Sequence, residues 1–209
     1  MYMIWERFQK LNCQKNNKFS DLKNKILKCN HCERNFGFKP NPVFWGKENS
    51  KIVQISQAPS KSVNESLKPF TDLSGKELRN VWYKISEEDF YNTDNFYIVA
   101  LAHCYPGKDK NGNDKIPPKC CYEMWIKKEI ELVDNKIYII IGAKAAKVFF
   151  PTEKFEELVF KNNVLNNKLA IVLPHPSPLN RLWLKKHPDF LESRMIEVRK
   201  IIKNTINDK

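Results

Sequence analysis

The sequence of 209 residues lacks a long hydrophobic run, which argues against a membrane-spanning helix. Such a helix needs about 18 or more consecutive apolar residues, whereas the longest apolar stretch here, residues 137–142, has the length of one strand. The first ten residues, MYMIWERFQK, include a glutamate and no apolar stretch of about 7–15 residues, so they do not resemble a secretory signal peptide. We therefore expect a cytoplasmic protein without a membrane partner.

The sequence also lacks internal repeats and low-complexity linkers, so nothing in it indicates a boundary between domains. Its length corresponds to one domain of about 150 residues with elaborations, and a chain of this size can bury a core without disulfide bonds. We expect a single domain over residues 1–209, with a helical N-terminal extension over residues 1–28 and a loop region over residues 29–50. Nothing in the sequence demands more than a monomer.

Acidic residues are in the minority. The chain has 24 Asp and Glu residues against 36 Lys and Arg residues, which gives a formal net charge of +12. Such an excess indicates a polyanionic partner, and DNA is the first candidate. The alternative explanation is a genome whose composition favours lysine and asparagine, and the charge alone leaves both explanations open.

Four short segments rich in β-branched and aromatic residues predict strands, and most of them are almost continuously apolar. Continuous apolarity is typical of strands that are buried on both faces of a parallel sheet. Helical segments alternate with these strands, which predicts an α/β domain with a mostly parallel sheet. The predicted strands are residues 51–57, 96–102, 136–141 and 169–173, and the predicted helices are residues 74–84, 121–133, 143–150, 152–160 and 188–204.

The residues that follow the predicted strands are candidates for one common site. Gln57 begins a Gln-Ala-Pro segment after the first strand, Cys104 follows the second, Gly142 follows the third, and His175 follows the fourth. Parallel strands end at the same edge of a sheet, and open α/β sheets bind their ligands at that edge. The sequence therefore predicts that these distant segments meet there.

Five of the six cysteines form two groups. Cys29 and Cys32 make a Cys-x-x-Cys pair before the first strand, and Cys104 is followed by Cys120 and Cys121 across a polar loop. Clustered cysteines in a reducing compartment indicate metal binding or catalysis, and four thiolates in this arrangement suit an iron–sulfur cluster. A zinc site and small core residues remain the alternatives. Neighbours on a helix face about 100° apart, so only one of Cys120 and Cys121 can point into such a site.

His175 lies between two prolines directly after the last predicted strand. Proline fixes its own φ angle and restricts the residue before it, so a stiff loop holds the imidazole. This mounting favours a functional histidine over a structural one. Gln57 and Phe70 lie in similarly stiff Gln-Ala-Pro and Pro-Phe segments and are further candidates.

The order and spacing of these segments resemble the uracil-DNA glycosylase superfamily, specifically its iron–sulfur branch, family 4. The resemblance covers nearly the whole chain and rests on the joint order of the segments, since no single one is decisive. These segments are Cys-x-x-Cys at 29–32, Gln-Ala-Pro at 57–59, Pro-Phe at 69–70, Cys104 followed by Tyr-Pro-Gly, a cysteine opening a helix 17 residues later, Ile-Ile-Ile-Gly-Ala-Lys-Ala-Ala at 139–146 and His-Pro-Ser-Pro at 175–178.

The resemblance implies a three-layer α/β/α sandwich around a central, mostly parallel four-stranded sheet. It also implies a monofunctional DNA glycosylase of base excision repair, which flips a nucleotide out of the duplex because the glycosidic bond is inaccessible in the base stack. His175 would donate a hydrogen bond to the oxyanion that develops on the base, and Phe70 would stack on the base. Gln57 occupies the position where family 4 has the glutamate that positions the attacking water.

The resemblance also implies the other site residues. Leu179 or Leu182 is a candidate wedge in the base stack, and Trp125 with the Glu129-Ile130 pair favours Cys121 as the fourth ligand. The implied substrate-binding residues are Ala58, Pro59, Phe70, Ala100 and Ser177; the implied DNA-binding residues are Leu179, Asn180, Arg181 and Lys185; and the implied ligands of a 4Fe–4S cluster are Cys29, Cys32, Cys104 and Cys121.

Two departures from the family pattern concern the Gln-Ala-Pro turn. Ser56 and Ser60 stand where the family has glycines, so the turn is expected to be less tight. Gln57 is neutral and cannot act as a general base. Asp72, Glu65 or the departing base would then have to supply the negative charge.

A third departure concerns base recognition. Ala100 stands where the family has an asparagine that reads the uracil edge, and this weakens strict uracil specificity. A glycosylase for another deaminated, oxidised or modified base is therefore one alternative. A non-catalytic iron–sulfur DNA-binding module of the same fold is a second, and a zinc-stabilised enzyme for a small acidic ligand is a third.

Overall fold

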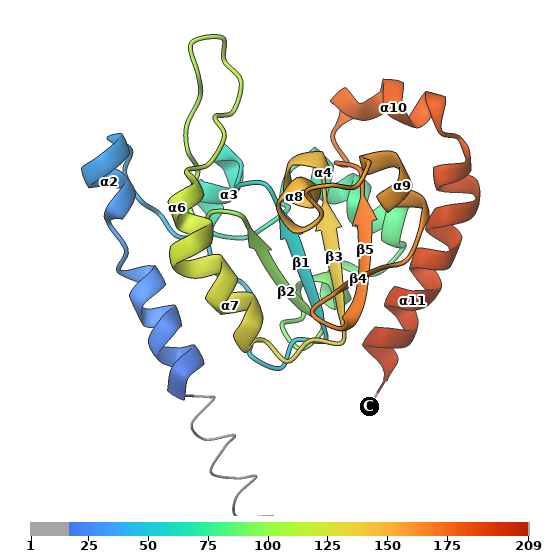
Figure 1. The fold of residues 1–209 in the computed structure, drawn as a ribbon, viewed down its shortest axis with the longest axis horizontal. Coiled ribbons are helices and arrows are strands. Elements are labelled where there is room, and N and C mark those ends of the chain that lie inside the picture. Colours follow the sequence, from blue (N-terminus) through green and yellow to red (C-terminus); the bar gives the residue numbers. More distant parts are fainter. Residues whose placement is uncertain (1–16, 209) are drawn as a thin grey trace, which may run out of the picture.

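The computed structural model describes residues 17–208, and within them a five-stranded sheet is covered by helices on both faces (Figure 1). The sheet order is β2-β1-β3-β5-β4, in which β4 alone runs antiparallel to its neighbour. The predicted sandwich with a mostly parallel sheet is confirmed. The strands are β1 (Ile52–Ser56), β2 (Phe96–Ala100), β3 (Ile137–Ile141), β4 (Asn163–Leu165) and β5 (Lys168–Leu173).

The prediction of four strands is wrong by one, because β4 was not expected. Asn166 and Asn167 connect β4 to β5, and their φ angles are 50° and 59°. A two-residue hairpin turn requires this left-handed conformation, which asparagine tolerates. The Asn-Asn pair is thus a turn signal in the sequence, but a strand of three residues is too short to show an alternating pattern.

The four parallel strands end together at one edge of the sheet. Every residue of β1, β2 and β3 is buried, as expected for strands that are covered on both faces. The register pairs Ser56 with Ala100 at the ends of β1 and β2, and Ile141 with Leu173 at the ends of β3 and β5. The loops after these strands therefore emerge side by side.

One helical layer lies in front of the sheet in Figure 1. The Phe19 ring of its first helix contacts the Tyr97 ring of β2 at a centroid distance of 6.1 Å, and Tyr122 contacts Phe149 at 5.9 Å. These aromatic contacts join the helices to the sheet and to one another. The layer comprises residues 17–27, α6 (Lys119–Cys121), η2 (Tyr122–Ile126), α7 (Lys127–Leu132), α8 (Ala143–Phe149) and α9 (Phe155–Phe160).

The second layer covers the opposite face. Its helices are held together by Arg199, which donates hydrogen bonds to the carbonyls of Trp82 at 2.7 Å and Val81 at 2.8 Å. This layer comprises α4 (Leu73–Lys76), η1 (Glu77–Tyr83), α5 (Glu87–Tyr91), η4 (Phe190–Arg194) and α11 (Met195–Asn207). The connecting segments contain α2 (His31–Phe36), α3 (Lys61–Ser66), η3 (Pro178–Asn180) and α10 (Arg181–Lys186).

The predicted helices are present with shifted ends. The predicted helix over residues 74–84 spans 73–83, that over 121–133 spans 119–132, and that over 152–160 begins only at Phe155. The short helices α2, α3, α5 and α10 were not predicted, because six or fewer residues cannot show a helical period. Of the predicted N-terminal extension, residues 17–27 are helical, and the remainder with Cys13 lies outside the described residues. No helix formed by residues 17–208 combines the length and apolar composition needed to cross a bilayer.

Candidate active site

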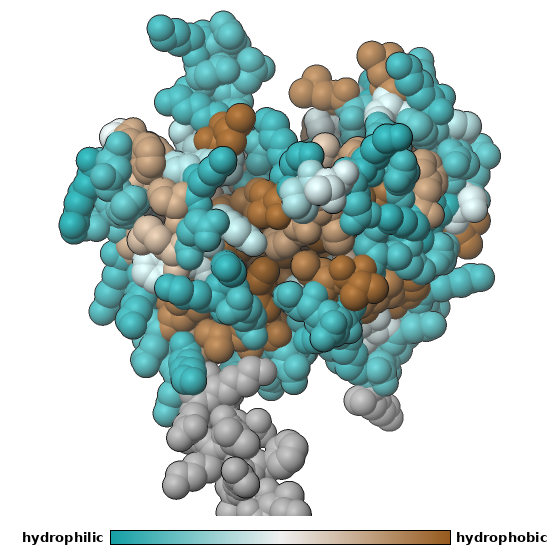
Figure 2. All heavy atoms as spheres, in the orientation of Figure 1, coloured by the Kyte–Doolittle hydropathy of each residue, from teal (hydrophilic) through white to brown (hydrophobic). Residues whose placement is uncertain are grey.

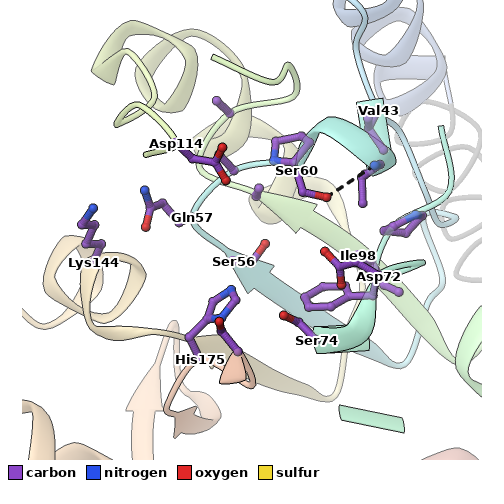
Figure 3. Close-up of a pocket in the computed structure, with 18 of the residues that line it drawn as sticks. Val43, Ser56, Gln57, Ser60, Asp72, Ser74, Ile98, Asp114, Lys144 and His175 are labelled. Carbon is purple, nitrogen blue, oxygen red and sulfur yellow. Dashed lines mark hydrogen bonds between the residues drawn. The ribbon is translucent and has the colours of Figure 1, made fainter. Parts of the chain in front are cut away.

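A cavity of about 510 Å³ opens at the edge of the sheet where the parallel strands end (Figure 3). The loops after β1 and β5 contribute Gln57 and His175, and the end of β2 contributes Ala100. Lys144 reaches the cavity from the first turn of α8, just after β3. Four segments that are distant in the sequence thus form one site, as expected for the carboxyl edge of an open α/β sheet.

Most of the predicted site residues line this cavity. Arg181 and Lys185 do not line it; they are exposed on α10 beside it. Leu179 and Leu182 are 94% and 73% exposed, so neither belongs to the core, and Figure 2 shows apolar atoms at the surface over α10. The predicted residues that line the cavity are Gln57, Ala58, Pro59, Phe70, Ala100, His175, Ser177, Leu179 and Asn180.

His175 is held at the cavity by its loop and by a close approach of the neighbouring turn. Asn180 donates a hydrogen bond from Nδ2 to the carbonyl of His175 at 3.0 Å. Gly142, with a φ angle of 90°, lies next to His175, where an added Cβ would make an ordinary contact of 3.7 Å with the Cβ of His175. The residue keeps an exposed surface at the cavity, but the protein packed around the ring removes part of its hydration and lowers the pKa of His175 below 6.5, while the Asp72 carboxylate opposes this shift. The imidazole is therefore neutral at pH 7.

Phe70 has a backbone conformation that a non-glycine residue rarely adopts. Its φ angle is 54°, and its carbonyl accepts hydrogen bonds from Arg79 Nη1 at 2.7 Å and from the Tyr91 hydroxyl at 3.0 Å. Gly75 lies against the same carbonyl, since a Cβ at that position would lie 1.7 Å from the Phe70 oxygen. Strained residues held by several partners cluster at functional sites, and here the strain presents the Phe70 ring to the cavity.

The wall of the cavity near the end of β2 is apolar. Ile98, Ala100 and Ala102 all line it, and none of them can form side-chain hydrogen bonds with a base. Gln57 is half-buried on the loop after β1 and contributes a neutral amide. The four residues that depart from the family pattern therefore all line the cavity: Ser56, Gln57, Ser60 and Ala100.

Four charged residues line the cavity without having been assigned to the site from the sequence: Asp72, Asp114, Lys115 and Lys144. Asp72 was considered only as a source of charge, together with Glu65, which does not line the cavity and pairs with Lys61 at 3.8 Å. Lys144 lies two residues after Gly142, and Gly142 was already expected at this edge of the sheet. Asp114 comes from a polar loop that carries no sequence signal for a site.

A second, small cavity brings together the cysteines that were predicted as ligands. Cys120 does not line it, and three of the four lining cysteines are buried. Cys121 therefore lines the cavity with the other thiols, whereas Cys120 lies outside the lining, although it is close enough to Cys32 to raise the pKa of that thiol. The lining cysteines are Cys29, Cys32, Cys104 and Cys121, and Ile26, Pro40, Pro42, His103 and Trp125 complete the wall.

The electrostatics of this cavity depend on what it contains. Burial raises the pKa of Cys32 and of Cys104 to about 11 and that of Cys121 to about 12, and the neighbouring cysteines add to each rise. A cation among the sulfurs would stabilise the thiolates and reverse these shifts. Within residues 17–208, no group of three or more His, Cys, Asp or Glu side chains is arranged to hold a metal ion. Four thiols around one cavity nevertheless match the all-cysteine ligand set of an iron–sulfur cluster.

A buried polar network lies beside the cysteine cavity. Both ring nitrogens of His103 contact acceptors, the Val43 carbonyl at 2.8 Å and Glu129 Oε2 at 2.8 Å. Burial by itself would lower the pKa of His103, but these acceptors outweigh it and raise the pKa. Tyr97 donates a hydrogen bond to the other oxygen of Glu129. The network ties β2 to α7 directly behind Cys104.

Comparison with known protein families matches residues 43–199 to the uracil-DNA glycosylase superfamily. The chain belongs to the uracil-DNA glycosylase superfamily. It is also similar to the Type-4 uracil-DNA glycosylase of Thermotoga maritima, with 21% identity over 181 residues that cover 85% of each chain. The superfamily match includes Gln57, Phe70 and His175 but begins after Cys29 and Cys32. Membership of this superfamily supports a DNA glycosylase, a hydrolase whose substrate is DNA.

Proposed function

We propose that this protein is a monofunctional DNA glycosylase of base excision repair, which removes uracil or another deaminated, oxidised or modified base. The observation that supports this most directly is the shared cavity of His175, Phe70 and Gln57 at the carboxyl edge of the sheet. These are the three residues to which the family resemblance gives roles in chemistry and base binding.

The proposed role of Phe70 is to stack on a base that has been flipped out of the duplex. An aromatic face gains dispersion energy from any base, and the Phe70 backbone is held in place by Arg79 and Tyr91. The ring is therefore positioned before the base arrives. Such preorganisation reduces the entropy that binding would otherwise cost.

The proposed role of His175 is to stabilise the departing base. Cleavage of the glycosidic bond leaves negative charge on a base oxygen, and a preorganised donor stabilises that charge in the transition state. The lowered pKa keeps the imidazole neutral, and a neutral imidazole still has one N–H to donate. Gln57 would hold the attacking water through its amide, without removing a proton from it.

The proposed DNA-contacting element is η3 with α10. Leu179 and Leu182 project into solvent beside the cavity, which suits a wedge that enters the base stack when a nucleotide is flipped. Arg181 and Lys185 on the same segment are placed to contact phosphates, which makes binding sensitive to salt. The Ser177 hydroxyl accepts a hydrogen bond from the N–H of Leu179 at 3.3 Å and caps this segment.

The cysteine cavity is proposed to hold a 4Fe–4S cluster with a structural role. Cys29, Cys32, Cys104 and Cys121 would be its ligands, because they alone among the described cysteines line the cavity. A cluster there would join the segment around α2 to the end of β2 and the start of α6. Its visible absorption would distinguish it from zinc, which is colourless.

A panel of duplexes, each with one altered base, tests the proposed function. Wild-type protein should convert at least one of the duplexes with uracil, hypoxanthine or hydroxymethyluracil into an abasic site without cutting the strand. His175→Ala should lower the rate by about 100-fold or more, since a single oxyanion donor contributes about 10²–10³-fold. Absence of cleavage across the panel by a folded wild-type protein would contradict the enzyme assignment.

A non-catalytic DNA-binding module is the second candidate. The neutral amide of Gln57 and the apolar Ala100 in the cavity favour it, because they remove charge and base-reading groups from the site. This candidate predicts tight, salt-dependent binding to damaged duplexes without any product. Equal affinity for plain and damaged duplexes would argue against a role in lesion recognition.

A further inference from the structure

Among the described residues, two carboxylates line the candidate active site, and they lie on different sides of His175 (Figure 3). Asp72 lies on the side of Phe70, and its Oδ1 accepts a hydrogen bond from the N–H of Gly75 at 3.0 Å as the N-cap of α4. Asp114 lies on the side of Gln57 and forms no salt bridge with any other described residue. The Asp72 carboxylate is therefore engaged as a helix cap, whereas the Asp114 carboxylate neither caps a helix nor pairs with a cation among the described residues.

The direction of the proposed reaction distinguishes the two carboxylates. When a glycosidic bond breaks by displacement, the base leaves on one side of C1′ and the water approaches from the other. A base stacked on Phe70 and bonded to His175 leaves on the Phe70 side, which is the side of Asp72. The water then approaches from the side of Gln57, where Asp114 lies.

The segment that carries Asp114 is an ordered hairpin. It projects in yellow-green above the sheet in Figure 1 and forms a hydrophilic projection in Figure 2. Asp114 forms a β-bridge with Lys108, and the N–H of Lys115 donates to the carbonyl of Gly107 at 2.9 Å. The hairpin connects Cys104 to Cys121, so both of its ends are anchored at the cysteine cavity.

Tyr105 orients the carboxylate of Asp114. Its hydroxyl donates a hydrogen bond to Asp114 Oδ1 at 2.8 Å. A phenol keeps its proton at neutral pH, so the hydroxyl is a donor to the carboxylate. One oxygen of Asp114 is thus held by Tyr105, and the other can accept a proton.

We propose that Asp114 is the general base of the glycosylase reaction, an assignment that rests on the function proposed above. Gln57 holds the water and the Asp114 carboxylate accepts its proton as the water oxygen bonds to C1′. The glycosidic bond breaks, and its electron pair leaves with the base. The proton on Asp114 then passes through solvent to the base anion, so the products are an abasic sugar and a neutral free base. The Asp114 carboxylate of the hairpin thereby supplies the negative charge that the neutral Gln57 lacks.

The test uses a duplex that wild-type protein cleaves, with single-turnover rates at saturating protein and DNA affinity measured separately by fluorescence anisotropy. Asp114→Asn should lower the single-turnover rate by about 100-fold, within the range of about 10²–10⁴-fold for a general base. Its DNA affinity should stay the same or increase, because a negative charge near the phosphates has been removed. Adding Gln57→Glu to Asp114→Asn should restore at least about 10-fold of the rate, because it returns a carboxylate to the side from which the water approaches.

The matched control is Asp109→Asn in the same hairpin. Asp109 accepts hydrogen bonds from the N–H groups of Asn111 at 2.8 Å and Asn113 at 2.9 Å, and it does not line the cavity. Asparagine retains an acceptor oxygen, so this variant should keep the rate of wild type, and its DNA affinity should stay the same or increase as in Asp114→Asn.

Three results would overturn the assignment. The first is an unchanged single-turnover rate in Asp114→Asn, and the second is a loss of rate that weaker DNA binding accounts for entirely. The third is a loss of rate in Asp72→Asn with full activity in Asp114→Asn, which would give the role to the other carboxylate. A folded wild-type protein without activity on any base would instead contradict the proposed function itself, and this assignment with it.

Discussion

His175 and Phe70 are residues whose conformations are imposed by their surroundings. His175 is held between prolines, against Gly142 and by the amide of Asn180. Phe70 keeps a left-handed backbone because donors on η1 and α5 bind its carbonyl and because Gly75 leaves room for it. Neither residue would adopt its conformation by its own preference. Contacts with the surrounding structure offset the energetic cost and hold a geometry that suits base binding.

The protonation of His175 can be measured directly by NMR titration of its imidazole. The pKa should lie below 6.5, because displacement of water disfavours the charged ring, and the ring should therefore lose its proton at a lower pH than an ordinary histidine. Asp72→Asn should lower this pKa further, since it removes the negative charge that favours protonation. Asparagine still caps α4, so the fold should be retained. A pKa at or above 6.5, or one that rises in Asp72→Asn, would contradict this account.

At the scale of elements, β2 and α7 are joined by a buried network rather than by apolar packing alone. Glu129 is 1% exposed and His103 3% exposed, and Tyr97 of β2 donates to the same carboxylate. Removing one partner of a buried ionic pair leaves the other without compensation. The network therefore holds the end of β2, where Cys104 begins the hairpin, against the helix that follows Cys121.

Glu129→Ala should lower the free energy of unfolding by about 3–5 kcal/mol, because it leaves His103 and Tyr97 buried without their acceptor. Tyr97→Phe removes only a donor and should cost about 1 kcal/mol. Urea unfolding followed by circular dichroism measures both values. Glu131→Ala, at an exposed position of α7, serves as the control and should change stability by less than about 0.5 kcal/mol. Similar losses of unfolding free energy in Glu129→Ala and Glu131→Ala would contradict the structural role assigned to the network.

At the scale of the whole molecule, the two cavities lie at different places, and one segment of the chain connects them. The hairpin over residues 105–119 starts and ends at the cysteine cavity, and its Asn113, Asp114 and Lys115 line the candidate active site. Whatever holds Cys104 and Cys121 together therefore also positions part of the active-site wall. The net charge of +12 surrounds this arrangement with a potential that attracts DNA.

Cysteine substitution tests the proposed cluster. Cys29→Ala and Cys104→Ala should yield colourless protein of low solubility, because each removes a ligand that joins the N-terminal segment to the sheet. Cys120→Ala should keep the visible absorption of wild type, since Cys120 does not line the cavity. Absorption spectra and iron analysis of the purified proteins measure the effect. Normal solubility and activity in Cys29→Ala and Cys104→Ala would contradict a structural role for the cluster.

The elements with strong local signals were predicted correctly. The four long strands are almost continuously apolar, and their burial on both faces requires only that helices cover the sheet. The missed β4, α2, α3, α5 and α10 are three to six residues long. Elements of that length are stabilised by their neighbours and by single caps such as Ser60 and Ser86, so their own sequence contains little evidence of them.

The sequence alone indicated which cysteines can bind metal, which histidine is held stiffly, and which strands are buried. Those features depend on side chains and on neighbours one to four positions away. The contact between Gly142 and His175 and the position of Asp114 beside Gln57 were decided only by the folded chain. They depend on strand register and on how the loops pack, and such contacts join residues whose separation along the chain leaves no local pattern.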